Sequence, residues 1–312
     1  LQMENQTTVM EFILLGITDD DQLQYVLFAI LLVTYILTLT GNILVFTITL
    51  INHHLQTPMY FFLRNFSVLE IAFTTTVIPK ALVNLALRKK TISLIGCLTQ
   101  NFLYFMLGAT EFFLLAVMSF DRYVAICKPL HYVTIMNSQV CSLMVISAWT
   151  SGAVLILSQL VVYLQVPFCG SNIINHFFCD STRMISLKCG NTKVLECTNF
   201  ILAVFTLLSS LTVTAVSYIH IITAVVKTPS GASRQKAFST FASHLTVVSI
   251  TYSSCIFMYL TPTQTNKLDL TKVVSVMNTV VSPLLNPFIY SLRNTQFQEA
   301  LRESIKWHKV IS

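Results

Sequence analysis

Residues 24–50 read QYVLFAILLVTYILTLTGNILVFTITL, and this stretch contains no Asp, Glu, Lys or Arg. A helix needs about 20 apolar residues to cross a hydrocarbon core, so the stretch is long enough to span a membrane. Windows without these four charged residues recur along the chain, and each can hold a span. They cover residues 22–63, 91–110, 129–179, 197–226, 237–266 and 273–292.

The overall composition agrees with a membrane protein. Of the 312 residues, 54% are hydrophobic and only 10% are charged, whereas a soluble domain carries about 25% charged residues. The mean hydropathy is +0.70. These values exclude a soluble globular enzyme, a disordered chain and a collagen-like fibre. The net charge of +6 is scattered, and the longest basic run is Arg88-Lys89-Lys90, so no nucleic-acid partner is expected.

Seven spans can be assigned. The stretch from Pro58 to Leu87 contains three charged residues, but the apolar and aromatic residues at its start still predict a helix. The window 129–179 is broken in its second half by PFCGSN at residues 167–172. Because backbone groups in lipid must be satisfied within each segment, the predicted fold is an all-α, seven-transmembrane helix bundle. The expected spans are 24–50, 58–87, 97–128, 140–165, 196–226, 236–261 and 270–292.

The regions outside the bundle are an N-terminal segment, 1–23, and a tail, 293–312, on either side of the transmembrane domain 24–292. Lys and Arg are almost equally numerous on the two sides of the predicted membrane domain. The positive-inside rule therefore gives little information on its orientation. The glycosylation sequon at Asn5 favours an extracellular N-terminus. In the tail, Phe297, Leu301 and Ile305 share one face, which predicts a short amphipathic helix lying on the membrane.

Half of the eight cysteines fall on the predicted outer side. Cys97 begins the third span, and Cys169, Cys179 and Cys189 lie between spans four and five. An even set on one face is typical of disulfides in an oxidising compartment. The alternative is that all four are free thiols.

Two acidic residues lie deep in predicted spans, where a charge costs about 2.5–3.5 kcal/mol. Glu70 and Glu111 lie at similar depth on antiparallel spans two and three, by the rise of an α-helix. Two carboxylates in one dry site cannot both stay ionised unless a cation or proton joins them, which indicates a sodium or proton site. The alternative is two unrelated carboxyls hydrogen-bonded to polar neighbours such as Asn42 or Asn286.

Asp121-Arg122-Tyr123 ends the third span. An adjacent acid and guanidinium at a membrane exit can form a lock that opens when the partner helix moves. The alternative is a surface ion pair worth about 0–1 kcal/mol.

Five motifs in order identify a resemblance. They are LQTPMYFFL at 55–63, MSFDRYVAICKPLHY at 118–132, Ser217-Tyr218, KAFSTFASHL at 236–245 and PLLNPFIYSLRN at 283–294. Over essentially its whole length the chain resembles tetrapod-type olfactory receptors, which are rhodopsin-like G-protein-coupled receptors. It departs from the usual family pattern in having Phe120 for Tyr, Glu70 for Asp, Phe241 for Cys, and Thr251-Tyr252-Ser253 for Phe-Tyr-Gly.

The resemblance implies two disulfides and an activation switch. Cys97 would pair with Cys179, and Cys169 with Cys189. Arg122 would hold Asp121 at rest and meet the G protein when active, while tyrosines of spans five to seven support the change. The switch residues implied are Asp121, Arg122, Tyr123, Tyr218, Tyr252, Asn286, Pro287 and Tyr290.

The resemblance also implies a ligand pocket in the outer half, between spans three, five, six and seven. Its lining is apolar with a few hydroxyls and no charge, which suits a small neutral volatile. The alternative is that these side chains only pack the bundle. The residues are Tyr104, Phe105, Gly108, Ala109 and Phe112 in span three, Leu202, Ala203 and Thr206 in span five, Cys255, Ile256 and Tyr259 in span six, and Val276 and Thr279 in span seven.

The expected function is that of an odorant-activated receptor, not an enzyme. Ligand binding would open the cytoplasmic face to a heterotrimeric stimulatory olfactory-type G protein and raise cyclic AMP. Further expected partners are membrane lipid, arrestin and receptor-transporting accessory proteins. No cofactor is expected apart from a bound sodium ion at Glu70 and Glu111. The expected location is the plasma membrane of olfactory sensory cilia.

Other functional classes fit the sequence less well. A retinal protein needs a Lys within span seven, and residues 273–292 contain none, with Lys272 only at the edge. A channel or transporter needs a polar path, and only Glu70 and Glu111 are charged at depth. The chain has no His-Glu-x-x-His or Gly-x-Ser-x-Gly motif of a membrane protease. A non-nasal chemosensor of the same family is the strongest alternative.

Overall fold

The computed structural model describes residues 10–18, 20–87, 90–169, 171–227, 231–260, 267–292 and 296–303. The structure describes only the backbone, and not the side chains, of residues 231–241, 243, 258–260, 267–270 and 290–292. Asn5 and Ile305 lie outside the described residues, as do the side chains of Tyr259 and Tyr290.

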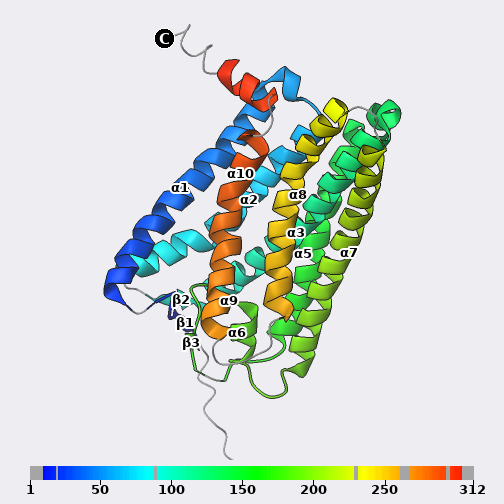
Figure 1. The fold of residues 1–312 in the computed structure, drawn as a ribbon. Helices are drawn as coiled ribbons and strands as arrows, with labels where there is room; N and C mark the ends of the chain where they lie inside the picture. The colour runs from blue at the N-terminus through cyan, green and yellow to red at the C-terminus, as the bar shows by residue number, and fades with distance from the viewer. Residues whose placement is uncertain are drawn as a thin grey trace, which may run out of the picture.

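Helices cover all seven predicted spans within the described residues, and they stand side by side as one bundle (Figure 1). The first five are α1 (Asp21–Ile51), α2 (Pro58–Leu87), α3 (Leu94–Cys127), α5 (Ser138–Leu164) and α7 (Lys193–Val226). Each of these five is long and apolar enough to cross a membrane. The sixth is α8 (Gly231–Leu260), and the seventh runs through α9 (Lys267–Val276), the π-helical stretch η3 (Met277–Val281) and α10 (Ser282–Leu292).

Capping residues explain why several helices start before the predicted spans. The Asp20 carboxylate accepts hydrogen bonds from the backbone N–H groups of Gln22 (2.8 Å) and Leu23 (3.2 Å), so α1 begins at Asp21. Ser93 caps α3 by accepting from the Gly96 N–H at 3.1 Å. These caps satisfy N–H groups that have no partner within the helix. The apolar windows mark the hydrocarbon core, and the helices continue beyond it to polar caps.

Helices α2 and α3 form the centre of the bundle. About half of the apolar window is buried in α2 (50%) and α3 (56%), against 11% in α1, so α1 presents most of its apolar surface outward. Helix α3 packs against α2, α5, α7 and α8. Glu70 and Glu111 therefore lie on the two most enclosed of the five long apolar helices α1, α2, α3, α5 and α7.

A small sheet covers one end of the bundle (Figure 1). Strand β1 (Glu11–Leu14) lies between β2 (Thr91–Ser93), to which it is antiparallel, and β3 (Ile173–Ile174), to which it is parallel. Phe12 and Leu14 are fully buried beneath it. The sequence analysis assigned this N-terminal segment no structure, because four residues are too few to show a strand pattern.

The loop between α5 and α7, which we call the lid, is fixed to α3 by one predicted disulfide and cross-linked within itself by the other. Cys97 is bonded to Cys179 and Cys169 to Cys189, so both expected pairings are confirmed. The lid contains a short helix, α6 (Ser181–Ile185). Its Lys188 ammonium donates to the carbonyl oxygens of Tyr163 (2.8 Å) and Val166 (2.5 Å), which satisfies acceptors at the end of α5.

Short helices join the spans at the opposite end. They are η1 (His53–Leu55), η2 (Pro129–His131) and α4 (Tyr132–Ile135). The tail is helical over residues 296–303, as predicted. Its Phe297 is 1% exposed and packs with Tyr60 and Leu63 of α2. This apolar face was expected to lie on the membrane, but at Phe297 it is turned to the bundle, because the inner ends of α1 and α2 offer an apolar surface that the sequence does not reveal.

Candidate functional site

Glu70 is fully buried and joins α2 to α10. Its Oε1 accepts a hydrogen bond from the Asn286 side-chain amide at 2.5 Å. Its Oε2 has no hydrogen-bond partner among the described residues. The Asn42 amide instead donates to the carbonyl oxygens of Thr38 and Pro283. Of the two amides that could have satisfied an intramembrane acid, only Asn286 does so.

Glu111 joins α3 to α8 at the same level of the bundle. The Thr251 hydroxyl donates to its Oε1 at 3.5 Å, a long contact. Glu70 and Glu111 lie within range of mutual electrostatic repulsion. A proton or a cation between two such carboxylates relieves that repulsion. The unpartnered Oε2 of Glu70 provides an acceptor for either.

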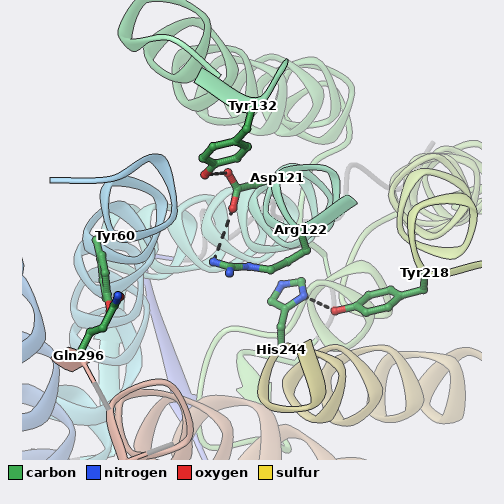
Figure 2. A network of polar contacts seen from close by, with 7 residues as sticks. All are labelled: Tyr60, Asp121, Arg122, Tyr132, Tyr218, His244 and Gln296. Carbon is green, nitrogen blue, oxygen red and sulfur yellow. Dashed lines mark hydrogen bonds and ion pairs between the residues drawn. The ribbon is translucent and has the colours of Figure 1, made fainter. Parts of the chain in front are cut away.

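Asp121 and Arg122 form an ion pair at the inner end of α3, with 3.5 Å between Oδ2 and the guanidinium (Figure 2). Both side chains are almost completely buried. The Tyr132 hydroxyl of α4 donates to Asp121 Oδ1 at 2.8 Å. Burial removes the water that weakens exposed ion pairs. The alternative of an ordinary surface ion pair therefore does not describe this site.

Tyr218 and His244 connect α7 and α8 beside this ion pair. The Tyr218 hydroxyl and His244 Nδ1 are 2.5 Å apart, and their rings are stacked. Figure 2 shows the His244 ring beside the side chain of Arg122, whose guanidinium points toward Asp121. The sequence predicts a role in the switch for Tyr218 and a polar link between helices for His244, and the contact between them confirms the link. The sequence analysis missed Tyr132, because the partner of its side chain lies on another helix.

The other expected switch residues lie in different surroundings. The ring of Tyr123 contacts His220 of α7 (5.5 Å between centroids) and Phe120 (6.0 Å). Pro287 lies against Gly41 of α1, where an added Cβ would come within 3.1 Å of the proline ring. Glycine thus permits α1 to approach the proline-containing turn of α10.

The expected pocket residues occupy the inward sides of α3, α7, α8 and the seventh helix. Tyr104 stacks on Phe73 of α2 (4.9 Å) and contacts Phe105 edge-on (5.2 Å). The Thr206 hydroxyl donates a hydrogen bond to the carbonyl oxygen of Leu202 in its own helix. Buried members are Tyr104, Ala109, Thr206 and Thr279. Half-buried members are Phe105, Gly108, Phe112, Leu202, Ala203, Cys255, Ile256 and Val276.

One aromatic contact joins an expected pocket residue to an expected switch residue. The rings of Phe112 in α3 and Tyr252 in α8 meet edge-to-face, 5.1 Å between centroids. Edge-to-face pairs of this kind contribute about 0.5–1.5 kcal/mol beyond burial. A change at Phe112 therefore reaches α8 directly at Tyr252, the residue next to Thr251 and its bond to Glu111.

The lid closes over the outer end of α3. The Cys179 backbone N–H donates to Gln100 Oε1 (3.0 Å), and its carbonyl accepts from the Asn101 amide (2.8 Å). Phe178 then lies against Tyr104, with ring centroids 4.4 Å apart. The lid thus contributes an aromatic side chain directly above the expected pocket, which the sequence analysis did not include.

Comparisons with known proteins agree with this architecture. The family model described as olfactory receptor matches residues 31–306. The human olfactory receptor 6C75 is 53% identical over 304 residues, which cover 97% of each chain. The mouse olfactory receptor 6E1 is also 53% identical over 304 residues, with the same coverage.

Among solved structures, squid rhodopsin superposes with a TM-score of 0.67. The match covers 92% of this chain and 87% of squid rhodopsin, at 16% sequence identity. This likeness shows a rhodopsin-like fold. With the sequence matches, which extend from the first helix to the tail, it supports one assignment: the chain belongs to the olfactory receptor family.

Proposed function

We propose that this protein is an odorant-activated G-protein-coupled receptor. The observation that carries the proposal is that α8 meets both regions: its Tyr252 contacts Phe112 of the expected pocket, and its His244 lies beside Arg122 at the inner end. Membership of the olfactory receptor family supports an odorant as ligand, and the rhodopsin-like fold supports G-protein coupling.

The ligand is a small volatile bound between α3, α7, α8 and the seventh helix. The membrane-embedded lining is aromatic and aliphatic, and the hydroxyl of Thr206 is engaged by its own backbone. Such a site binds chiefly through apolar contact, with one or two polar contacts that set orientation. The protein is thus a receptor for compounds that partition readily into an apolar pocket.

Activation is a shift between two states of the bundle. In the resting state Asp121 and Tyr132 hold Arg122 at the inner end of α3. Ligand contact at Phe112 displaces Tyr252, and α8 moves away from α3. Arg122 then becomes available to a stimulatory olfactory-type G protein, and cyclic AMP rises. Tyr290, Asn286 and Pro287 are proposed to accommodate the movement of α10.

The test is cyclic AMP in cells that co-express this chain and a stimulatory olfactory G protein, screened with small neutral volatiles. Arg122→Ala is expected to abolish the response while surface expression stays near normal. Arg302→Ala is the matched control, because Arg302 is an exposed arginine of the tail. Persistent signalling by Arg122→Ala at normal surface levels would contradict the proposed role of the ion pair.

A sodium ion is proposed to bind at Glu70 and Glu111 in the resting state. The unpartnered Glu70 Oε2 and the long contact from Thr251 to Glu111 support it. We predict that Glu111→Gln makes basal cyclic AMP insensitive to replacement of sodium by a bulky organic cation. An unchanged sodium response in this variant would remove the cation from the mechanism and leave a shared proton.

The site of action is the plasma membrane of sensory cilia, with the N-terminus outside and Asn5 glycosylated. Arrestin and receptor-transporting accessory proteins are proposed as further partners. The two disulfides support an extracellular lid, because such bonds persist in oxidising compartments.

A further inference from the structure

His176, in the lid, has a buried imidazole whose nitrogens make no hydrogen bond within the part of the chain that the structure describes. We propose that its ring N–H donates a hydrogen bond to the carbonyl oxygen of the odorant, so that the receptor selects aldehydes and ketones over hydrocarbons. This inference deepens the proposed function and rests on it.

The imidazole of His176 is fully buried, yet neither Nδ1 nor Nε2 has a hydrogen-bond partner among the described residues. Its backbone is fully used: the N–H donates to the Ile174 carbonyl (2.8 Å), and the carbonyl accepts from the Gly16 N–H (3.2 Å). The ring is therefore held in place by strand β3 and the N-terminal segment. A buried polar group without a partner costs free energy and points to a missing partner such as a ligand.

The ring lies next to the expected pocket. It stacks on Phe177 (4.7 Å between centroids) and meets Phe178 edge-on (4.5 Å). Phe178 in turn lies 4.4 Å from Tyr104, the outermost of the expected pocket residues in α3. The disulfide at Cys179 fixes this part of the lid to α3. Phe178 thus contacts both the His176 ring and Tyr104 of the expected pocket.

The protonation state of His176 determines what it offers a ligand. Burial and, to a smaller extent, the cations Lys272 and Arg183 together lower the pKa of His176 to about 3. The imidazole is therefore neutral at physiological pH and offers one N–H donor. Lys272, whose charge acts on His176, lies one turn before Val276 of the expected pocket, which places the imidazole near the outer end of the seventh helix.

The experiment measures cyclic AMP in cells expressing the full chain, with five eight-carbon probes: octanal, 2-octanone, 1-octanol, octanoate and octane. His176→Phe keeps an aromatic ring for stacking but removes both nitrogens. His176→Gln restores an N–H donor. Thr182→Ala is the matched control, because Thr182 is exposed in the same lid. Surface expression is measured for every variant, and His176→Met replaces the Phe variant if the latter does not reach the surface.

We expect the wild type to respond to octanal or 2-octanone at lower concentration than to the other probes. His176→Phe should raise the half-maximal concentration of the carbonyl probes by about tenfold, the effect of one buried hydrogen bond. The response to octane should not change, and His176→Gln should recover most of the loss. A general disturbance of the lid would weaken all probes alike, so the ratio of carbonyl to hydrocarbon potency separates the two effects.

Three results would overturn the inference. In the first, His176→Phe reaches the cell surface and responds to the carbonyl probes with unchanged potency. In the second, octane and octanal activate the wild type with equal potency. In the third, no carbonyl probe activates the wild type although its basal cyclic AMP still depends on Arg122. A cyclic AMP signal that does not depend on Arg122 at all would contradict the receptor function itself. The comparison of the wild type with Arg122→Ala distinguishes this failure from a failure of the His176 inference.

Discussion

Asp121 shows how one residue gains its role from two partners. Its carboxylate is paired with Arg122 on its own helix and accepts the hydroxyl of Tyr132 from the following short helix. Hydrogen bonds to a buried charge are stronger than those between neutral groups. Tyr132 therefore holds the acid in the position from which it restrains Arg122, although Tyr132 lies ten residues beyond that arginine in the sequence.

We predict that Tyr132→Phe raises basal cyclic AMP. A hydrogen bond to a charged group is worth about 1.5–3 kcal/mol. Because this bond stabilises the resting state, its loss shifts the equilibrium toward the active state. An increase of several-fold over wild type, normalised to surface expression, is expected. Tyr25→Phe is the control, because Tyr25 of α1 is 68% exposed and lies outside the switch and the expected pocket. Equal basal levels in the wild type and Tyr132→Phe would mean that the phenol does not restrain the switch.

Strand β1 organises the outer end of the bundle. It pairs with β2 on one side and β3 of the lid on the other, so it joins segments that are about 80 residues apart in sequence. Phe12 contacts Phe168 at 5.1 Å between ring centroids and lies in the cluster that contains Cys97 and Cys179. The N-terminal strand thus continues the core of the lid.

We predict that Phe12→Ala destabilises the receptor and reduces its surface expression. Truncation of a buried Phe costs about 3–5 kcal/mol, because it removes apolar contact and leaves a cavity. The thermal unfolding temperature of the detergent-purified receptor is the measurement. Met10→Ala is the matched control, since Met10 is 71% exposed two residues away. If both variants unfold at the wild-type temperature, the strand does not contribute to the stability of the lid.

Helix α3 connects the outer and inner sites of the whole molecule. It carries Cys97 at the lid, Phe112 and Glu111 in the middle, and Arg122 at the inner end. Its 34 residues extend roughly 50 Å at 1.5 Å per residue. Every proposed step, from ligand contact to release of Arg122, therefore takes place against one continuous element.

The stability of the whole fold should depend on the protonation of His176. Its pKa is about 3 in the folded protein, against an ordinary 6.5, so between these values the unfolded chain binds a proton that the folded protein does not. Stability is therefore lost as pH falls from 6.5 toward 3, at up to about 1.4 kcal/mol per pH unit. We predict that the unfolding temperature of the wild type falls more steeply between pH 6.5 and 4 than that of His176→Phe. Parallel curves for the two proteins would show that His176 is not buried in its neutral form.

The sequence by itself determined the seven helices, the depth of Glu70 and Glu111, and the position of Asp121-Arg122, because lipid restricts the backbone to helices and makes every buried charge conspicuous. The disulfide pairing followed from resemblance to a family. Only the tertiary structure decided that Asn286 is the partner of Glu70, that Tyr132 and His244 belong to the inner network, and that Phe178 of the lid contacts both His176 and Tyr104. These contacts join residues from different elements, and hydropathy gives the location of each helix but not its rotation or the neighbour that each face meets. The N-terminal strand was missed for a related reason: a four-residue strand is stabilised by its partners in the sheet and not by its own pattern.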